Sequence, residues 1–365
     1  MTRPLVLKVG TSTLTGGGGS VSLERVAAIA DALADLHSRG YAPVLVSSGA
    51  VAAGRQQLNW PELPRQIPAK QMLAAVGQPQ LLGQYQQALA THGLVGAQIL
   101  LSRADLERRL SWLNARNTLR ALLDQGVIPI VNENDSVATE ELRFGDNDRL
   151  SALVATLVDA ERLLLLTDQD GLYSADPTGN PEAELIAEVV AAVPDALRAA
   201  AGQSAGSQGT GGMASKLEAS DLARRAGIGV IIANGAQLQR IPALLEGRGL
   251  GTYLHAQADR LEARKRFILG ALEAGSIELD AGAVLALGDG RSLLPVGVSA
   301  VNGRFARGDV VRIQDHAGRE LARGVVNYGA DDLRRIAGQR SEAIEGLLGY
   351  HLGNSVVHRN DLVMV

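Results

Sequence analysis

The chain has 365 residues, of which 46% are hydrophobic and 20% are charged, and its formal net charge is −4. This length exceeds what one hydrophobic core usually supports, so we expect two domains. The charge balance argues against a protein that coats nucleic acid, and the absence of cysteine excludes disulfides, thiolate metal sites and a catalytic thiol.

No apolar run approaches the roughly 18 to 20 residues that a membrane-spanning helix needs. The apolar run at residues 5–9 is too short for the core of a signal peptide, and no cleavage site follows it. We therefore expect a cytoplasmic protein that does not enter a membrane.

Short apolar runs rich in β-branched residues alternate with amphipathic helical stretches from residue 4 to about residue 260. These runs predict buried strands at residues 5–9, 43–47, 95–100, 127–131, 163–167 and 229–233. The alternation is typical of βαβ units, so we predict an α/β domain over residues 1–260, an αβα sandwich with a mostly parallel central sheet. Such sheets bind ligands at the carboxyl ends of their strands.

A clear helix is indicated between the first two strands. Val26, Ala30 and Leu33 share one face, and Ser22 stands where an N-cap is expected.

The pattern changes near residue 275, where short, turn-rich segments begin. They predict strands at residues 277–279, 284–287, 310–313, 321–328 and 356–357, with one short helix near residues 331–337. We expect a linker at residues 261–275 and a small, mostly β domain at residues 276–365.

The first predicted strand carries Lys8 and is followed by Gly10 and two hydroxyl residues. A lysine in an apolar strand is costly to bury unless a negative group awaits it. Glycine and hydroxyl residues also let backbone N–H groups face an anion. The alternative is an edge-strand lysine that reaches water.

Polar turns follow two further strands. Ser48 and Gly49 precede a helical segment and suit an anion, although an ordinary N-cap explains the same residues. Thr167 and Asp168 follow a later strand and could bind ribose, a base or a metal. Turn chemistry alone also accounts for the acidic and glycine residues beyond them.

Amides and carboxylates gather in two places. Asn132 and Asp135 follow the fourth strand, and Asn147 and Asp148 open a helix predicted at residues 149–158. Such groups suit an ammonium group, a magnesium ion or the orientation of lysines. Asx turns and N-caps use the same residue types.

A glycine-rich segment at residues 201–212 precedes the helix that carries Lys216. No strand precedes this segment, so the dinucleotide fingerprint does not apply, and Ser215 stands where a P-loop requires glycine. A phosphate cradle with Lys216 one turn into the helix remains, and a flexible linker is the alternative.

These residues meet the needs of phosphoryl transfer, which requires positioning and positive charge more than covalent help. Lys8 and Lys216 supply the charge, and an acid orients them. A carboxylate acceptor is already ionised at neutral pH and needs no general base. None of the six histidines lies in these motifs, which favours a kinase that acts on a small carboxylate.

In this order, the motifs resemble the amino acid kinase family. Residues 70–78 and 113–118 look typical of its members that phosphorylate glutamate, and residues 333–338 resemble part of a PUA domain. The resemblance covers nearly the whole chain.

The resemblance implies ATP-dependent phosphorylation of the side-chain carboxylate of L-glutamate to L-glutamyl 5-phosphate, the first step of proline biosynthesis. It implies that Lys8 and Lys216 stabilise the transferring phosphoryl group and that Asp148 holds both lysines. The residues implied in glutamate binding are Ser48, Asn132, Asp135 and Asn147. Those implied in contacting ATP are Lys8, Gly10, Thr167, Asp168, Thr210, Gly211, Gly212, Met213, Ala214, Ser215 and Lys216. Mg²⁺ is expected to be held mainly by the ATP phosphates, without a separate protein metal site.

The family also implies inhibition by proline and a homodimer or homotetramer. Aspartokinase, acetylglutamate kinase, carbamate kinase and uridylate kinase share the phosphate machinery and stay open as alternatives. Aspartokinases usually carry regulatory domains of another type, and the others usually lack a PUA-like tail. An RNA-binding protein is the alternative from another class. Residues 276–365 hold ten arginines, no lysine and eleven acidic residues, so we expect a regulatory or assembly role instead.

Overall fold

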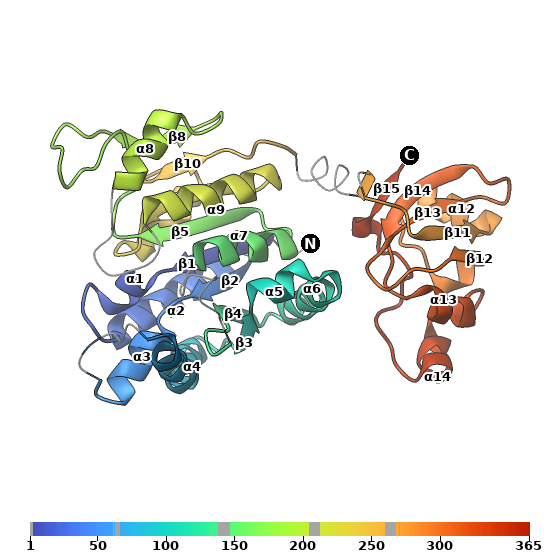
Figure 1. Ribbon diagram of the computed structural model, residues 1–365, viewed down its shortest axis with the longest axis horizontal. Coiled ribbons are helices and arrows are strands. Elements are labelled where there is room, and N and C mark those ends of the chain that lie inside the picture. Colours follow the sequence, from blue (N-terminus) through green and yellow to red (C-terminus); the bar gives the residue numbers. More distant parts are fainter. Residues whose placement is uncertain are drawn as a thin grey trace. The chain divides into compact units, whose positions relative to one another are not determined.

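The computed structural model describes residues 3–60, 62, 66–137, 147–203, 212–259, 268–269 and 271–365. The chain divides into two compact units, Met1–Arg260 and Leu261–Val365 (Figure 1). Within the described ranges, no helix is both long enough and apolar enough to span a membrane.

The larger unit is built on an eight-stranded sheet that contains all six strands predicted there. In spatial order the strands are β3 (Gly96–Leu101), β4 (Ile128–Glu133), β2 (Tyr41–Ser47), β1 (Arg3–Val9), β5 (Arg162–Thr167), β9 (Gly229–Asn234), β10 (Thr252–Leu254) and β8 (Glu188–Val189). Neighbouring strands pair in parallel except β10, which runs antiparallel to β9. The prediction of a mostly parallel sheet is therefore confirmed.

Helices connect these strands in the way that parallel pairing requires. They are α1 (Thr11–Thr15), α2 (Leu23–Ser38), α3 (Ala50–Gln57), α4 (Ile67–Ala90), α5 (Arg103–Glu107), α6 (Arg109–Asp124), α7 (Asn147–Leu157), α8 (Asp195–Gln203), α9 (Met213–Arg225) and α10 (Ile241–Leu245). A small hairpin pairs β6 (Leu172–Tyr173) with β7 (Leu185–Ile186). At the start of α2, the Ser22 side chain accepts a hydrogen bond from the backbone N–H of Arg25, so the predicted N-cap is confirmed.

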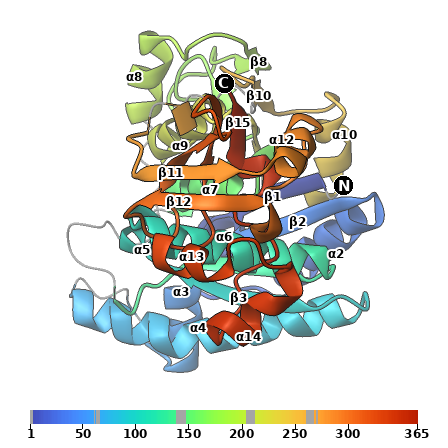
Figure 2. The same ribbon diagram turned by 90° about the vertical axis from the view of Figure 1, so that its right-hand side faces the viewer.

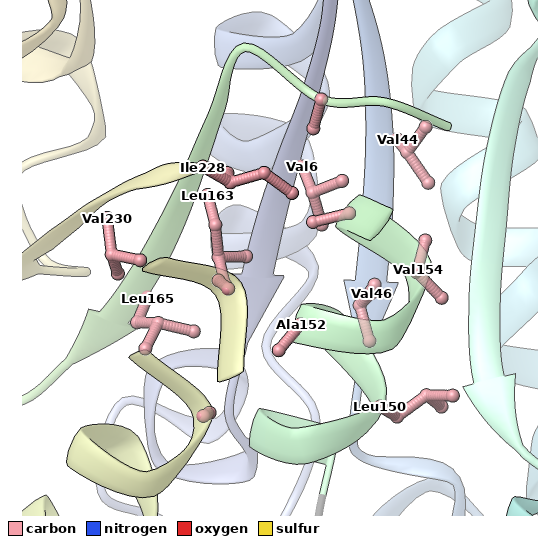
Figure 3. Close-up of a cluster of buried hydrophobic side chains, with 14 of the residues drawn as sticks. Val6, Val44, Val46, Leu150, Ala152, Val154, Leu163, Leu165, Ile228 and Val230 are labelled. Atoms are coloured by element: carbon pink, nitrogen blue, oxygen red, sulfur yellow. The ribbon is translucent and has the colours of Figure 1, made fainter. Parts of the chain in front are cut away.

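Each face of the sheet has its own core. On one face the strands pack with residues of α6, α7 and α9, and on the other with α2 and α4. Side chains alternate between faces along a strand, so Val6 points to the first face while Leu5 and Leu7 belong to the second core. Figure 3 shows Val6 on β1 and Val46 on β2 near Ala152 on α7. Because Lys8 is two residues beyond Val6, the strand also directs Lys8 toward α7 and α9.

Helices α3 and α4 pack so closely that two glycines are required between them. A Cβ added at Gly54 would lie 1.9 Å from the carbonyl oxygen of Leu73, and one at Gly77 would lie 1.9 Å from that of Ala50. The obstacles are backbone atoms, which cannot rotate away as a side chain can. This contact fixes the position of α4 beside the polar turn that follows β2.

The smaller unit forms a five-stranded sheet with its own buried core. Its strands are, in spatial order, β12 (Val298–Gly303), β11 (Gly275–Leu279), β13 (Val310–Gln314), β14 (Glu320–Val325) and β15 (Leu362–Met364). Figure 2 shows β11 and β12 side by side, and these two strands pair antiparallel. The sheet confirms a small, mostly β architecture. The predicted linker at residues 261–275 lies largely outside the described residues.

Some local predictions for this unit were wrong. Residues 284–287, predicted as a strand, belong to the helix α12 (Ala281–Gly288), whose N-cap Asp280 accepts a hydrogen bond from the N–H of Ala283 at 2.7 Å. Residues 356–357 contribute only an isolated bridge between Val357 and Leu293, and the strand predicted at 321–328 ends at Val325. Beside the predicted helix, now α13 (Ala330–Ile336), there is a further helix, α14 (Ile344–Leu348).

Candidate active site

Lys8 and Lys216 converge on one carboxylate at the carboxyl end of the central strands. Nζ of Lys8 lies 2.7 Å from Oδ1 of Asp148, and Nζ of Lys216 lies 3.4 Å from Oδ2. The exposed fractions are 4% for Lys8, 5% for Lys216 and 1% for Asp148, so the three charges are held away from bulk water. We call Lys8, Asp148 and Lys216 the charge triad.

Three separate elements position the charge triad. Lys8 stands one residue before the end of β1, Asp148 lies in the first turn of α7, and Lys216 lies one turn into α9. Gly212, the N-cap of α9, brings no side chain to the start of that helix. Since α7 and α9 cover the sheet face toward which Lys8 points, the fold itself brings the three side chains together.

The electrostatics of the charge triad favour the ionised form of Asp148. Burial alone would raise the pKa of Asp148, but the charges of Lys8 and Lys216 and the hydrogen bonds from Lys8 and Ser215 outweigh it and bring that pKa to about 2. Burial lowers the pKa of Lys216, and the attraction of Asp148 and of Asp168 opposes this change. Two ammonium groups around one carboxylate leave a positive charge in a buried place, which suits an anionic ligand.

Further predicted residues surround the charge triad. Oγ of Ser215 donates a hydrogen bond of 2.6 Å to Oδ2 of Asp148, and so holds that carboxylate from a third side. Oγ1 of Thr167 donates to Oδ1 of Asp168 at 3.0 Å beyond the end of β5. A Cβ at Gly10 would lie 3.5 Å from Nζ of Lys8. Because glycine has no side chain, only the backbone of residue 10 borders that ammonium group.

A second cluster, of amides and a hydroxyl, lies beside the charge triad because Asn147 directly precedes Asp148. Nδ2 of Asn147 donates to Oγ of Ser48 at 2.8 Å and to Oδ1 of Asn132 at 3.0 Å. Nδ2 of Asn132 donates in turn to Oε1 of Gln78 at 2.7 Å. We call Gln78, Asn132, Asn147 and Ser48 the amide relay. Gly49 follows Ser48 with a φ of +108°, a left-handed conformation that glycine adopts without strain.

Asp135 is half-buried on the loop after β4. Burial raises the pKa of its carboxyl to about 6. A carboxylate in this state gains from a cationic partner, because a nearby positive charge favours its ionised form.

The structure therefore brings together most of the predicted site residues. Thr210 and Gly211 lie outside the described residues. Met213 and Ala214 begin α9, but the side chain of Met213 is buried in the hydrophobic core, so its side chain serves packing.

Two residues that shape the site were not predicted from the sequence. Gln78 lies within a stretch noted only as typical of the family, and no spacing rule marks it as a site residue. The second is Ser47, the last residue of β2, whose Oγ lies 3.0 Å from the hydroxyl of the buried Tyr85 and so holds the start of the turn at Ser48. A glutamine inside the otherwise apolar face of a helix is the signal that points to Gln78.

The sequence matches two family models. The model of the amino acid kinase family covers residues 3–234, and the model of the PUA domain covers residues 275–348. Curated relatives named glutamate 5-kinase, from Escherichia fergusonii and Escherichia coli, are 51% identical over 362 residues, which is 99% of this chain and 98% of each relative.

The fold is similar to that of a carbamate kinase from Giardia lamblia whose solved structure holds AMP-PNP. The TM-score is 0.52 at 17% sequence identity, over 70% of this chain and 98% of that chain. This likeness concerns the fold alone. The chain belongs to the amino acid kinase family and, by its full-length relatives and its PUA domain, to the glutamate 5-kinases within that family.

Proposed function

We propose that the chain transfers the terminal phosphoryl group of ATP to the side-chain carboxylate of L-glutamate, giving L-glutamyl 5-phosphate, as the first step of proline biosynthesis. The observation that carries this proposal is the buried charge triad beside the amide relay. One cluster offers positive charge for a phosphoryl group, and the other offers directed hydrogen bonds for a small polar substrate.

The residues present suit ATP and its magnesium ion. Three features would hold the ATP phosphates. They are the excess positive charge of the charge triad, the backbone at Gly10 and the N-terminus of α9 at Gly212. Thr167 and Asp168 would contact the rest of the nucleotide. When bound, ATP supplies the phosphoryl group, and Mg²⁺ accompanies the phosphates.

The chain contributes position and charge to the reaction. The substrate carboxylate is ionised near neutral pH, so no residue has to remove a proton from it. Lys8 and Lys216 stabilise the negative charge that spreads over the phosphoryl oxygens. Asp148 keeps the two ammonium groups at the distance that the transfer needs, and Ser215 keeps Asp148 in place.

The substrate side is assigned to the amide relay and to Asp135. Ser48, Asn132 and Asn147 offer directed hydrogen bonds, and the carboxylate of Asp135 attracts the α-ammonium group of glutamate. These groups distinguish an amino acid from a simple carboxylic acid, since the ammonium group needs an anionic or carbonyl partner.

The assignment of Lys8 and Lys216 is tested by a coupled assay of ADP release with glutamate, ATP and Mg²⁺. Lys8→Ala and Lys216→Ala are each expected to lower kcat by about a hundredfold or more, because each removes a charge that stabilises the transition state. Arg39→Ala is the matched control: it removes an exposed cation paired with Asp35 and is expected to leave kcat unchanged. Wild-type turnover in both lysine variants would contradict the role assigned to Lys8 and Lys216. Phosphorylation of aspartate or N-acetylglutamate in place of glutamate would contradict the proposed substrate.

The Asp135 assignment predicts a pH dependence of substrate binding. The pKa of about 6 means that Asp135 loses its charge as the pH falls through 6, so the KM for glutamate is expected to rise at lower pH. The increase is about tenfold between pH 8 and pH 5 if only the ionised form binds. The substrate's own side-chain carboxyl titrates near 4.3, below this range.

Asp135→Asn provides the control for this prediction. It is expected to raise the KM for glutamate at every pH and to abolish the increase near pH 6. A KM that stays constant from pH 5 to pH 8 in the wild type rules out this role of Asp135.

We further propose that the enzyme acts in the cytoplasm as a homodimer or homotetramer and that proline inhibits it near the glutamate site. For the smaller unit we propose a regulatory or assembly role. Several of its arginines already form ion pairs with acids of the same unit, for example Arg319 with Asp315 and Arg334 with Asp331, which leaves less charge for RNA. Kinetics with added proline and the mass of the purified enzyme in solution check these points, and salt-sensitive RNA binding would contradict the role proposed for the smaller unit.

A further inference from the structure

Gln78 is a buried polar residue on α4 that touches the site through other side chains. It is 8% exposed, and its Oε1 accepts a hydrogen bond of 2.7 Å from Nδ2 of Asn132. The neighbouring residue, Gly77, is wedged against the backbone of α3, so the helix holds Gln78 in a fixed place. A buried amide at such a position needs a structural or functional reason.

The direction of every hydrogen bond in the amide relay is set by one backbone group. The N–H of Glu133 donates to Oδ1 of Asn132 at 2.8 Å, and a backbone N–H can only donate. The oxygen of Asn132 must therefore face Glu133 and Asn147, and its NH₂ group must face Gln78. Gln78 in turn must present its oxygen.

This direction decides what the site offers to a ligand. Both hydrogens of Nδ2 of Asn147 are used, one by Asn132 and one by Ser48. Because Oγ of Ser48 accepts one of them, its own hydroxyl hydrogen is free to be donated. Oδ1 of Asn147 is buried and finds no hydrogen-bond partner in the described part of the chain, so it is an acceptor.

We propose that Gln78 is a positioning residue of the substrate site: by holding the NH₂ end of Asn132, it keeps the amide relay in the orientation that presents a Ser48 donor beside an Asn147 acceptor. A donor next to an acceptor suits a zwitterion, with a carboxylate oxygen on the first and an ammonium group on the second. Gln78 itself touches neither substrate nor phosphate. The inference rests on the function proposed above for the substrate site.

Steady-state kinetics of Gln78→Met test this inference. Methionine fills a similar volume but offers no oxygen, so Nδ2 of Asn132 is left buried without its acceptor and the relay loses its orientation. The KM for glutamate is expected to rise about tenfold to a hundredfold, while the KM for ATP changes little and the melting temperature falls by a few degrees, because one buried donor is left unpaired. Gln78→Glu keeps an oxygen at the same place and is expected to restore most of the affinity. Gln87→Met, at an exposed position of the same helix, is the matched control and should match the wild type.

A double-mutant cycle with Asn132→Leu tests whether Gln78 acts through Asn132. If it does, Gln78→Met adds nothing further to the KM for glutamate of Asn132→Leu. Full additivity overturns the inference, as does an unchanged KM for glutamate in Gln78→Met, an equal rise of the KM for ATP, or a failure of Gln78→Glu to restore affinity. A wild-type enzyme that does not turn over glutamate refutes the proposed function instead, so the two failures are distinguishable.

Discussion

Replacing Asp148 with asparagine is expected to lower kcat by about a hundredfold to a thousandfold. The side chain keeps its shape but loses the charge that attracts Lys8 at 2.7 Å and Lys216 at 3.4 Å. Without that carboxylate, burial and the charge of Lys8 lower the pKa of Lys216 further. The two buried ammonium groups repel each other, so their positions at the phosphoryl group are lost.

The same substitution is expected to destabilise the protein by about 3–5 kcal/mol, because it leaves buried charge without its partner. The pKa of Asp148 is about 2 in the folded state, below its ordinary value of 3.8. A lowered pKa means that the ionised carboxyl stabilises the fold above about pH 4, and that this contribution is lost as the pH falls through 2. Thermal unfolding at neutral pH therefore shows the full effect.

Asp35→Asn is the matched control for this prediction, since it neutralises an exposed aspartate that pairs with Arg39. Exposed pairs contribute at most about 1 kcal/mol, so both kcat and the melting temperature should stay near wild type. An Asp148→Asn enzyme with more than a tenth of the wild-type kcat contradicts the role of the charge triad.

Gly77→Ala is expected to lower the free energy of unfolding by about 3 kcal/mol or more, through overpacking. The added Cβ would lie 1.9 Å from the carbonyl oxygen of Ala50 and 2.2 Å from the backbone nitrogen of Gly54, so α3 and α4 must separate. For a protein of this size the melting temperature should fall by about 6–12 °C. Because α4 also carries Gln78, the KM for glutamate is expected to rise in whatever fraction stays folded.

Gly83→Ala in the same helix provides the control with the opposite sign. Apart from its chain neighbours and the helix's own backbone, no atom of the described residues lies within 4 Å of a Cβ built there. Alanine favours helix over glycine by about 0.5–1 kcal/mol, so this variant should be slightly more stable than the wild type. If Gly77→Ala melts at the wild-type temperature, the close packing of α3 on α4 does not limit stability.

Much of the site followed from the sequence because the chemistry sits at strand ends. Lys8, Asp148 and Lys216 are far apart in the chain, but each stands where a parallel sheet directs residues to one edge. In the structure, the alternation along β1 places Lys8 on the same face as Val6, which α7 and α9 cover. The resemblance implied that Asp148 holds both lysines, but the sequence could not show that Oδ1 meets Lys8 and Oδ2 meets Lys216, since this depends on side-chain packing.

The error at residues 284–287 has a physical reason. A short apolar run fits a buried strand as well as a buried helix, and periodicity cannot separate them. The informative residues lie outside the run: Asp280 caps the helix, and the alanines at 281, 283 and 286 favour it.

Gln78 shows a different limit of prediction from sequence. Its neighbours in sequence do not explain it, because the partner that it holds, Asn132, lies on another element 54 residues away. Long-range partners of this kind are visible only once the sheet has placed β4 beside α4.

The central place of β1 has a consequence for how the chain folds during synthesis. This first strand pairs on one side with β2, at Arg3 and Tyr41, but on its other side with β5, at Leu5 and Arg162. Pairs so distant in sequence form late and slowly, and the open edge of an apolar strand invites aggregation until they form. In the nascent chain, Lys8 places a charge in this otherwise apolar strand long before Asp148 and Lys216 have been made. A charge within an apolar strand disfavours aggregation, so the lysine of the charge triad also suits the strand before the sheet is complete.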